Sequence, residues 1–373
     1  MTSAITNQLQ LHTKQCLQLM KSLQISNIRT TMYMQRPRKR NPTWFIKETT
    51  AKHDDLLTKD NTEFIKSKVH EKFGAPVVKH GIQTYESPVK SIVNIADLPK
   101  AEWTPQSRRT GVIAKKIGVY PLWLKDGTKI LTTLLQVVDN HVIKYMSPEE
   151  YDPPRKGRRG VIRNPKACLL VGAVSTDPSL LTKQYCGLFD KAGVMPKSVL
   201  HRFMITPEAY LPPGTPLNVT HYRVGDVVDV RGLTIDRGFQ GVMKKHGFKG
   251  MPWSHGVTKT HRRPGNIGGG GEKGRVWPGT KLPGWMGNRW RVLRGLKIWR
   301  INTKYNVMWV SGHNIPGPTN SYCYIYDTLL PLRRPTEALP FPTAPELEDI
   351  PEEIVDETMH DFKNPTITFT ETK

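Results

Sequence analysis

Residues 237–300 combine many positive charges with many glycines, and this pairing constrains the fold more than any other feature of the chain. They hold fifteen Lys and Arg, fifteen Gly and five of the nine Trp residues, but a single acid, Glu272. A segment so basic and so poor in aliphatic side chains cannot bury a core of its own. It is predicted to order only on binding a polyanion, and the interleaved aromatic side chains favour nucleic acid.

The charge of the whole chain points the same way. The 373 residues carry a formal net charge of +23. Residues 341–373 hold nine Asp or Glu and two Lys, a net charge of −7, so residues 1–340 carry +30. Such an excess implies a polyanionic partner. No apolar run approaches the roughly 18 residues of a membrane span, so membrane insertion is not expected.

Cysteine and histidine spacing gives no sign of a metal site. Cys16, Cys168, Cys186 and Cys323 are far apart in the sequence. This spacing argues against a zinc ribbon or a disulfide scaffold and fits a reducing compartment. The extension's own His246, His255 and His261 lack Cys or acid partners at ligand spacing, so contacts to phosphate or base are favoured over metal. No cofactor is predicted.

The first 46 residues contain no acid, since the earliest is Glu48. They are rich in Ser, Thr, Gln, Lys and Arg, and they end near the basic run RPRKR at residues 36–40. Leaders of this kind resemble mitochondrial transit peptides, which predicts a protein of the mitochondrial matrix. The alternative is a disordered basic arm that itself touches nucleic acid.

Beyond the leader, the pattern changes from helical to strand-like. Apolar residues after Asp60 follow helical spacing in a docking arm that is too poor in core residues to fold alone. From residue 111 short apolar runs alternate with turn signals, and Asp126-Gly127 is typical of a tight hairpin. A short helix is expected over 180–191. Strands over 296–301 and 307–310 flank Tyr305-Asn306.

The predicted fold is therefore mainly β with some α: a small closed β-barrel with a long basic extension inserted between its strands. The predicted segments are a transit peptide (1–46), a docking arm (47–110), the first part of the barrel with helical and hairpin insertions (111–236), the extension (237–300), the return strands (301–340) and an acidic tail expected to stay flexible (341–373).

Motifs that resemble enzyme sites fail on their context. Gly269, Gly271 and Gly274 match a dinucleotide fingerprint, but no strand precedes them and no helix follows. The adjacent Ser254 and His255 lack a carboxylate for a triad, since Glu272 is the only acid nearby. The sequence thus predicts a protein that is not an enzyme.

The composition of the extension suggests how it contacts RNA. Arginines make forked contacts to phosphate, glycines permit close backbone approach, and aromatic rings stack on unpaired bases. For Trp290 and Trp299, packing against the barrel is favoured. The predicted RNA-binding residues of the extension are Arg237, Lys244, Lys245, His246, Lys249, Trp253, His255, Lys259, His261, Arg262, Arg263, Gly265, Gly268, Lys273, Arg275, Trp277, Lys281, Trp285, Asn288, Arg289 and Arg291. Outside it they are Lys115, Lys116, Arg158 and Arg159.

These residues also carry a resemblance to a known family. The motifs in chain order are GVIAKKIG (111–118), FDKAGV (189–194), GFQGVMKKHGF (238–248), SHG (254–256), HRRPGNIG (261–268), GWMGN (284–288) and GHNIPG (312–317). Together they resemble the large-subunit ribosomal protein three family, from about Gly111 to Tyr326. The acid-free leader favours its mitochondrial branch.

The resemblance implies a barrel of the translation-factor type whose extension penetrates large-subunit ribosomal RNA. In that family the tip lies near the peptidyl transferase centre, and members help to nucleate subunit assembly. Carried over here, the tip corresponds to about residues 264–274. Many bacterial relatives have a methylated glutamine where this chain has Gly269, so that modification cannot occur at this position.

The function predicted from the sequence is a structural constituent of the mitochondrial large ribosomal subunit. Its expected partners are large-subunit ribosomal RNA and, through the N-terminal arm and the C-terminal tail, neighbouring mitochondrial ribosomal proteins; no small-molecule substrate is expected. Two alternatives have different requirements. A free RNA-binding assembly factor has the same charge pattern, whereas an RNA-modifying or nucleotide-dependent enzyme needs a pocket of convergent acids and bases.

Overall fold

The computed structural model describes residues 58–74, 76–79, 82–85, 102–151, 167–178, 181–269, 274–335, 337–344 and 350–360. The chain divides into two compact units. Unit 1 comprises Met1–Ala101 and Asp139–Leu217, and unit 2 comprises Glu102–Val138 and Asn218–Lys373. Residues 139–217, which the sequence pattern assigned to the first part of the barrel, therefore form a compact unit with the N-terminal segment.

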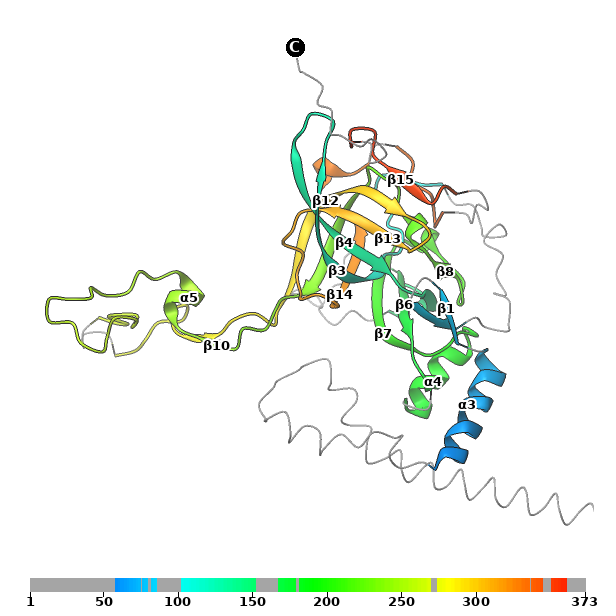
Figure 1. The fold of residues 1–373 in the computed structure, drawn as a ribbon, viewed down its shortest axis with the longest axis horizontal. Helices are drawn as coiled ribbons and strands as arrows, with labels where there is room; N and C mark the ends of the chain where they lie inside the picture. Colours follow the sequence, from blue (N-terminus) through cyan, green and yellow to red (C-terminus); the bar gives the residue numbers. More distant parts are fainter. Residues whose placement is uncertain are drawn as a thin grey trace, which may run out of the picture. The chain divides into compact units, whose positions relative to one another are not determined.

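Unit 2 is built on one antiparallel sheet (Figure 1). Its strands are β3 (Val112–Trp123), β4 (Lys129–Val137), β9 (Val227–Leu233), β12 (Trp290–Asn302), β13 (Val307–Ser311), β14 (Tyr322–Asp327) and β15 (Glu353–Val355). The order is β13-β4-β3-β14-β9-β12-β15, and β13 also pairs with β12. Each strand from β13 to β12 in that order thus has at least two neighbours, and the buried residues of these strands include Val112, Val230, Ile298, Met308 and Ile325.

The predicted hairpin is confirmed between β3 and β4. Gly127 has φ +79°, a backbone conformation that glycine adopts without a steric penalty. The Asp126 carboxylate accepts a hydrogen bond of 3.0 Å from the Thr128 amide, which fixes the turn. The first apolar stretch after residue 111 forms the single strand β3, with a bulge between Lys116 and Gly118.

A second bulge shapes β12, where the register to β9 shifts between Leu293 and Leu296. Gly295 occupies it with φ +72° and donates its amide to the buried Asp229 carboxylate at 2.9 Å. Arg333 donates to the Gly295 carbonyl at 2.7 Å. Such bulges increase local twist and curvature, so Gly295 and Asp229 help to curve the sheet.

A buried arginine joins distant segments of unit 2. Arg109 donates to both carboxylate oxygens of Asp327, at 2.8 and 3.0 Å, and to the carbonyl of His221 at 2.7 Å. His221 is itself buried and bridges the carbonyl of Thr110 and the hydroxyl of Thr343, each at 3.0 Å. Because an unpaired buried guanidinium is costly, this network holds the entry to β3 and the segment after β14 in place.

Unit 1 contains a four-stranded antiparallel sheet in the order β7-β6-β5-β8. Its elements are α3 (Lys59–Phe73), β1 (Pro76–Lys79), β2 (Ile82–Tyr85), β5 (Asn140–Met146), β6 (Ala167–Ser175), α4 (Lys183–Asp190), β7 (Lys197–Ile205) and β8 (Pro216–Leu217). Phe189 of α4 packs with Ile143, Leu170 and Val194 into a core. Short 3₁₀ turns are η5 (Pro207–Ala209) in unit 1 and η6 (Val219–His221) and η7 (Pro331–Arg333) in unit 2.

The helices of unit 1 begin and end differently from the sequence prediction. The predicted N-terminal helix exists, but it begins at Lys59 after Thr58, and Asp60 lies in its first turn. No residue of α3 is buried, and Lys72 forms an exposed ion pair with Asp190 at 3.3 Å. The predicted helix over 180–191 is confirmed as the shorter α4, which Thr182 caps by accepting from the Tyr185 amide.

The acidic tail is not flexible throughout, so that expectation is wrong for residues 350–360. Strand β15 pairs with Arg300–Asn302 of β12. Met359 is buried, and the amide of His360 donates to the carbonyl of Trp123 at 3.1 Å.

In the part of the chain that the structure describes, no helix is long and apolar enough to cross a bilayer.

Candidate nucleic-acid interface

The extension leaves the sheet after β9 and returns at β12, so its base is a two-stranded stem (Figure 1). Strands β10 (Phe239–Gln240) and β11 (Gly284–Trp285) pair antiparallel. Backbone hydrogen bonds of 2.9–3.0 Å from Met286 to Gly238 and from Arg237 to Met286 continue the pairing. The composition predicted order only on binding, whereas the structure gives the stem its own hydrogen bonds. Strand β12 begins at Trp290, inside the range 237–300.

Glycine is required at one position of this stem. Gly287 has φ +85°, and a Cβ there would lie 1.9 Å from the carbonyl oxygen of Ile235. Asn288 follows with φ +51°, which asparagine tolerates better than most residues. The GWMGN motif therefore fits the point where the second limb of the stem returns toward β12. Asn288 matters there for its left-handed backbone conformation.

Helix α5 (Val242–His246) lies beyond the stem and ends at Gly247, which has φ +74°. Val242 is 1% exposed and is the single buried residue among the described residues 237–289. The His246 ring donates to the carbonyl of Leu282 at 3.1 Å, and this bond joins the two limbs of the extension. Such sparse burial leaves nearly all side chains of the extension available to a partner.

Trp253 and His261 stack at the next level of the extension. Their rings lie 4.8 Å apart with planes at 20°, and Trp253 remains 82% exposed. The His261 Nδ1 donates to the carbonyl of Pro252 at 2.9 Å, which fixes the imidazole beneath the indole. The main chain is held as well, because the Met251 amide donates to the carbonyl of His261. An exposed indole supported on one face is suited to stacking on a base.

The described parts of the tip expose cations beside further aromatic surface. Arg262 and Arg263 are exposed, and the guanidinium of Arg275 lies 5.1 Å from the centroid of the 59% exposed Trp277 ring. The Gly268 amide donates to the Asn266 side chain at 3.0 Å, which bends the chain after the HRRPGNIG motif. Lys273 lies outside the described residues.

Within the described part of the extension, the predicted cations are not used in ion pairs. None of those described forms an ion pair with another described residue. Lys245 is half-buried; the other described cations are exposed: Arg237, Lys244, Lys249, Lys259, Arg262, Arg263, Arg275, Lys281, Arg289 and Arg291. His255 and Gly265 are exposed too, and Trp285 packs edge-on against Phe239 at 6.4 Å.

The four residues predicted outside the extension differ in their surroundings. The Lys116 ammonium donates to the carbonyls of Ile315 and Gly317 at 2.7 and 2.9 Å, and burial lowers its pKa. The Lys116 ammonium is therefore engaged by backbone carbonyls of the protein itself. Lys115 is half-buried and lies across from Tyr322 of β14. Arg158 and Arg159 lie outside the described residues.

Two aromatic residues go beyond the sequence prediction. Trp290 packs against the sheet as expected, stacked on Tyr324 with ring centroids 5.4 Å apart, but 45% of its surface stays exposed. Phe239 was not selected, and it is 64% exposed. Their exposure depends on strand register and on the stem, neither of which can be read from composition.

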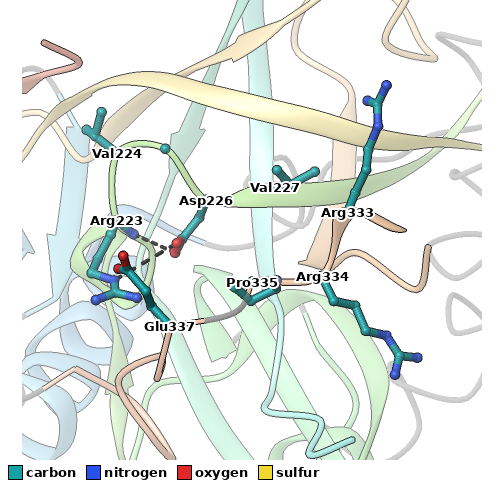
Figure 2. Close-up of a pocket in the computed structure, with 9 residues that line it drawn as sticks. Arg223, Val224, Asp226, Val227, Arg333, Arg334, Pro335 and Glu337 are labelled. Carbon is teal, nitrogen blue, oxygen red and sulfur yellow. Dashed lines mark hydrogen bonds and ion pairs between the residues drawn. The ribbon is translucent and has the colours of Figure 1, made fainter. Parts of the chain in front are cut away.

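A pocket in unit 2 bears on the enzyme alternative (Figure 2). It lies between the turn before β9 and the segment after η7, and it is lined by Arg223, Asp226, Arg333, Arg334 and Glu337 among others. Asp226 accepts from the Arg223 amide at 2.9 Å and pairs with Arg109 at 3.5 Å. Although burial raises its pKa, this carboxylate is engaged by partners inside the protein.

Metal ligands and reactive thiols do not gather in the described structure. Within the described ranges no three His, Cys, Asp or Glu side chains are close enough to hold a metal ion. Burial raises the pKa of Cys168 and of Cys323 to about 11, which keeps both as thiols at neutral pH.

Comparisons with known proteins agree in one family. Residues 191–314 match the family model described as ribosomal protein L3. The chain is 38% identical over 258 residues to "Large ribosomal subunit protein uL3m" of Arabidopsis thaliana, which covers 68% of this chain and 75% of that protein. It is 33% identical over 221 residues to "Large ribosomal subunit protein uL3" of Rickettsia prowazekii and of Rickettsia canadensis, covering 59% of this chain and 96% of each relative.

Proposed function

The chain belongs to the ribosomal protein L3 family, and on that premise we propose that it is a structural RNA-binding constituent of the mitochondrial large ribosomal subunit. The observation that carries the RNA-binding part is the extension. It presents a series of exposed cations without internal ion pairs and buries only Val242 among its described residues 237–269 and 274–289.

The proposed mechanism is charge neutralisation of folded RNA by a narrow stem. Arginines such as Arg262 and Arg263 contact phosphates in forked geometry, and the exposed lysines act as mobile point charges. The rings of Trp253, Trp277 and Trp285 stack on unpaired bases or fill shallow grooves. Release of counterions from the RNA supplies much of the affinity.

The finer features of the family belong to the same proposal. The ring of strand pairings in unit 2, from β13 through β4 and β9 to β12 and back, supports a closed barrel of the translation-factor type. The extension then carries residues 264–274 toward the peptidyl transferase centre, where RNA performs the chemistry. The protein would contribute to subunit assembly by stabilising RNA folded around this arm.

The mitochondrial location rests on two observations. The first 46 residues lack acids and resemble a transit peptide, although they lie outside the described residues. The chain is also similar to the plant protein uL3m over 258 residues. The N-terminal arm and the C-terminal tail are the proposed contact surfaces for neighbouring mitochondrial ribosomal proteins.

Fractionation separates this function from its alternative, a free RNA-binding assembly factor. A mitochondrial lysate is run on a sucrose gradient, with and without ribonuclease, and blotted for the chain. Co-migration with the large subunit, lost on RNA digestion, is the expected result. A peak at the top of the gradient in both samples would contradict residence on the ribosome.

A charge-reversal variant tests the tip. Arg262→Glu with Arg263→Glu should block incorporation into the subunit, because two exposed cations become anions facing phosphate, while the sheet stays folded. Lys129→Glu is a charge-reversal control, since Lys129 is exposed at the start of β4 and lies far from the extension in the chain. Incorporation of the double variant at the normal level would show that these tip residues are dispensable for assembly.

A further inference from the structure

One face of the sheet in unit 2 carries an aromatic platform outside the extension. Tyr324 of β14 pairs directly with Arg231 of β9, and Trp290 of β12 stacks on Tyr324 with ring planes at 26°. Tyr324 is 8% exposed and forms the floor, whereas Trp290 keeps 45% of its surface exposed. Trp290 is thus an indole fixed from within the protein and open on its outer side.

Arginines surround this platform. The guanidinium of Arg231 lies 5.1 Å from the centroid of the Trp290 ring. Arg294 is exposed on β12, four residues beyond Trp290. Burial and the Asp229 charge raise the pKa of Tyr326, two residues beyond Tyr324 on the same face, and the nearby charges of Arg231 and Arg294 oppose that rise. Arg231 and Arg294 therefore both lie near Tyr326.

The charges of Arg231 and Arg294 are not neutralised inside the protein. Neither forms an ion pair with any residue in the described ranges. Asp229, the acid on this side of β9, is fully buried. Its two oxygens accept from the amides of Gly295 and Leu329, at 2.9 and 3.2 Å, so both are engaged by the backbone.

The patch continues directly from the stem of the extension. Trp290 begins β12 immediately after Arg289, whose amide donates to the Thr234 hydroxyl at 3.1 Å and closes the stem. On the other side, Tyr322 lies on the same face as Tyr324 and pairs with Lys115. The platform therefore extends the positive surface of the stem across three strands of the sheet.

We propose that Trp290, Tyr324, Arg231 and Arg294 form a binding site for an unpaired RNA nucleotide, with its base stacked on Trp290 and its phosphate held by the two arginines. The inference rests on the proposed function for its ligand class but concerns a separate site. A supported indole with unpaired arginines offers both interactions that single-stranded nucleic acid needs. A protein partner would have to supply acids to both arginines, so the charge favours RNA.

Binding of a fluorescein-labelled oligouridylate of twelve nucleotides to the full chain, followed by anisotropy, tests the site. Loss of stacking on one base is worth roughly 1–3 kcal/mol, so Trp290→Leu should weaken binding by about 5- to 100-fold. Trp290→Phe should retain most of the affinity, since a phenyl ring still stacks. Tyr305→Leu is the matched control, because Tyr305 is 44% exposed on the turn between β12 and β13.

Two further measurements separate the site from the extension. Photo-crosslinking to 4-thiouridine RNA should label a peptide containing Trp290 or Tyr324. Arg231→Gln with Arg294→Gln should make the log–log salt slope less steep by about 1.4–1.8, the value of two phosphates. Circular dichroism and melting curves confirm that each variant is folded.

The outcomes distinguish the two proposals. If Trp253→Leu weakens binding but Trp290→Leu does not, and no crosslink forms at the patch, the site is refuted while RNA binding by the extension stands. If neither variant changes RNA affinity and the salt slope is flat, the proposed function fails as well. If Trp290→Leu retains its RNA affinity but no longer retains a protein that co-purifies with the unmodified chain, the patch binds protein instead.

Discussion

At the scale of single residues, Gly287 determines whether the stem can close. Replacement by Ala would put a Cβ 1.9 Å from the Ile235 carbonyl oxygen at a backbone with φ +85°. We predict that Gly287→Ala separates the limbs of the stem, exposes the extension to limited proteolysis and lowers RNA affinity, while the sheet of unit 2 melts at nearly the same temperature.

Two other glycines of the stem provide controls for this prediction. Gly238 has φ +67° but open space around a Cβ, and Gly241 has open space and no positive φ. Gly238→Ala should cost only the left-handed backbone, about 1–2 kcal/mol, and Gly241→Ala should have little effect. Equal protease sensitivity in all three variants would show that the contact with Ile235 is unimportant.

His221 makes the stability of unit 2 depend on pH. Burial, and secondarily the nearby Arg109 charge, hold its pKa well below 6.5. The folded protein therefore keeps a neutral ring, whereas the unfolded chain binds a proton below about pH 6.5. Stability is fully present above that pH and should fall as pH drops, with a slope approaching about 1.4 kcal/mol per pH unit from this group.

Urea unfolding followed by tryptophan fluorescence between pH 7.5 and 5.5 checks this prediction. Eight of the nine tryptophans lie in unit 2, so the signal reports that unit. His221→Asn should lower stability but flatten its pH dependence. His141→Asn is a suitable comparison, because burial also lowers the pKa of His141, which belongs to unit 1. An unchanged pH slope in His221→Asn would contradict the assignment.

At the scale of elements, β15 places an acidic segment over a basic part of β12. Glu353 pairs with Arg300 at 2.6 Å, Asp356 with Lys297 at 2.7 Å and Glu352 with Lys304 at 3.1 Å. We hypothesise that these acids compete with RNA for the three cations. Neutralising them (Glu352→Gln, Glu353→Gln, Asp356→Asn) should raise RNA affinity and make the salt slope steeper by about 2–3.

The same change in net charge elsewhere in the tail is the control. Glu346, Glu348 and Asp349 lie outside the described residues, and their neutralisation also adds three positive charges. Competition by β15 predicts a larger gain in affinity for the paired set than for this one. Equal gains in RNA affinity would show that net charge alone, and not competition by β15, explains the effect. Loss of the exposed Lys304–Glu352 pair should cost at most about 1 kcal/mol, whereas the partly buried Lys297–Asp356 pair should contribute more to stability.

Local sequence signals predicted the strands and turns of unit 2, but they did not predict which strands pair with one another. Asp126-Gly127 and Tyr305-Asn306 carry the left-handed residues that tight turns require, and both turns occur, with Asn306 at φ +51°. The sequence did not indicate that β12 begins at Trp290, because basic residues continue on both sides of this position. The pairing of β15 with β12 joins residues about fifty positions apart, and an acidic, Pro-rich context gives no local sign of it.

At the scale of the whole molecule, charge and motif order indicated the family, while the division into units did not follow from the sequence. Strands β5 to β7 are marked by short apolar runs like those of unit 2, so nothing local assigns 139–217 to a separate core. Among the candidate contacts, composition identified residues that the structure leaves exposed, such as Arg262 and Trp253. It could not show that the Lys116 ammonium is bound by carbonyls, since these belong to the distant residues 315 and 317.

The charge of the molecule sets the form of its RNA binding. If about eight phosphates are neutralised, each contributing about 0.7–0.9, log affinity against log salt should fall with a slope of about −6 to −7. Fluorescence anisotropy with a large-subunit ribosomal RNA fragment at several salt concentrations measures it. Arg262→Glu with Arg263→Glu should make the slope less steep by at least about 1.4–1.8, the value of two phosphates. A nearly salt-independent affinity of the unmodified chain would refute neutralisation as the basis of binding, because base stacking alone carries no such dependence.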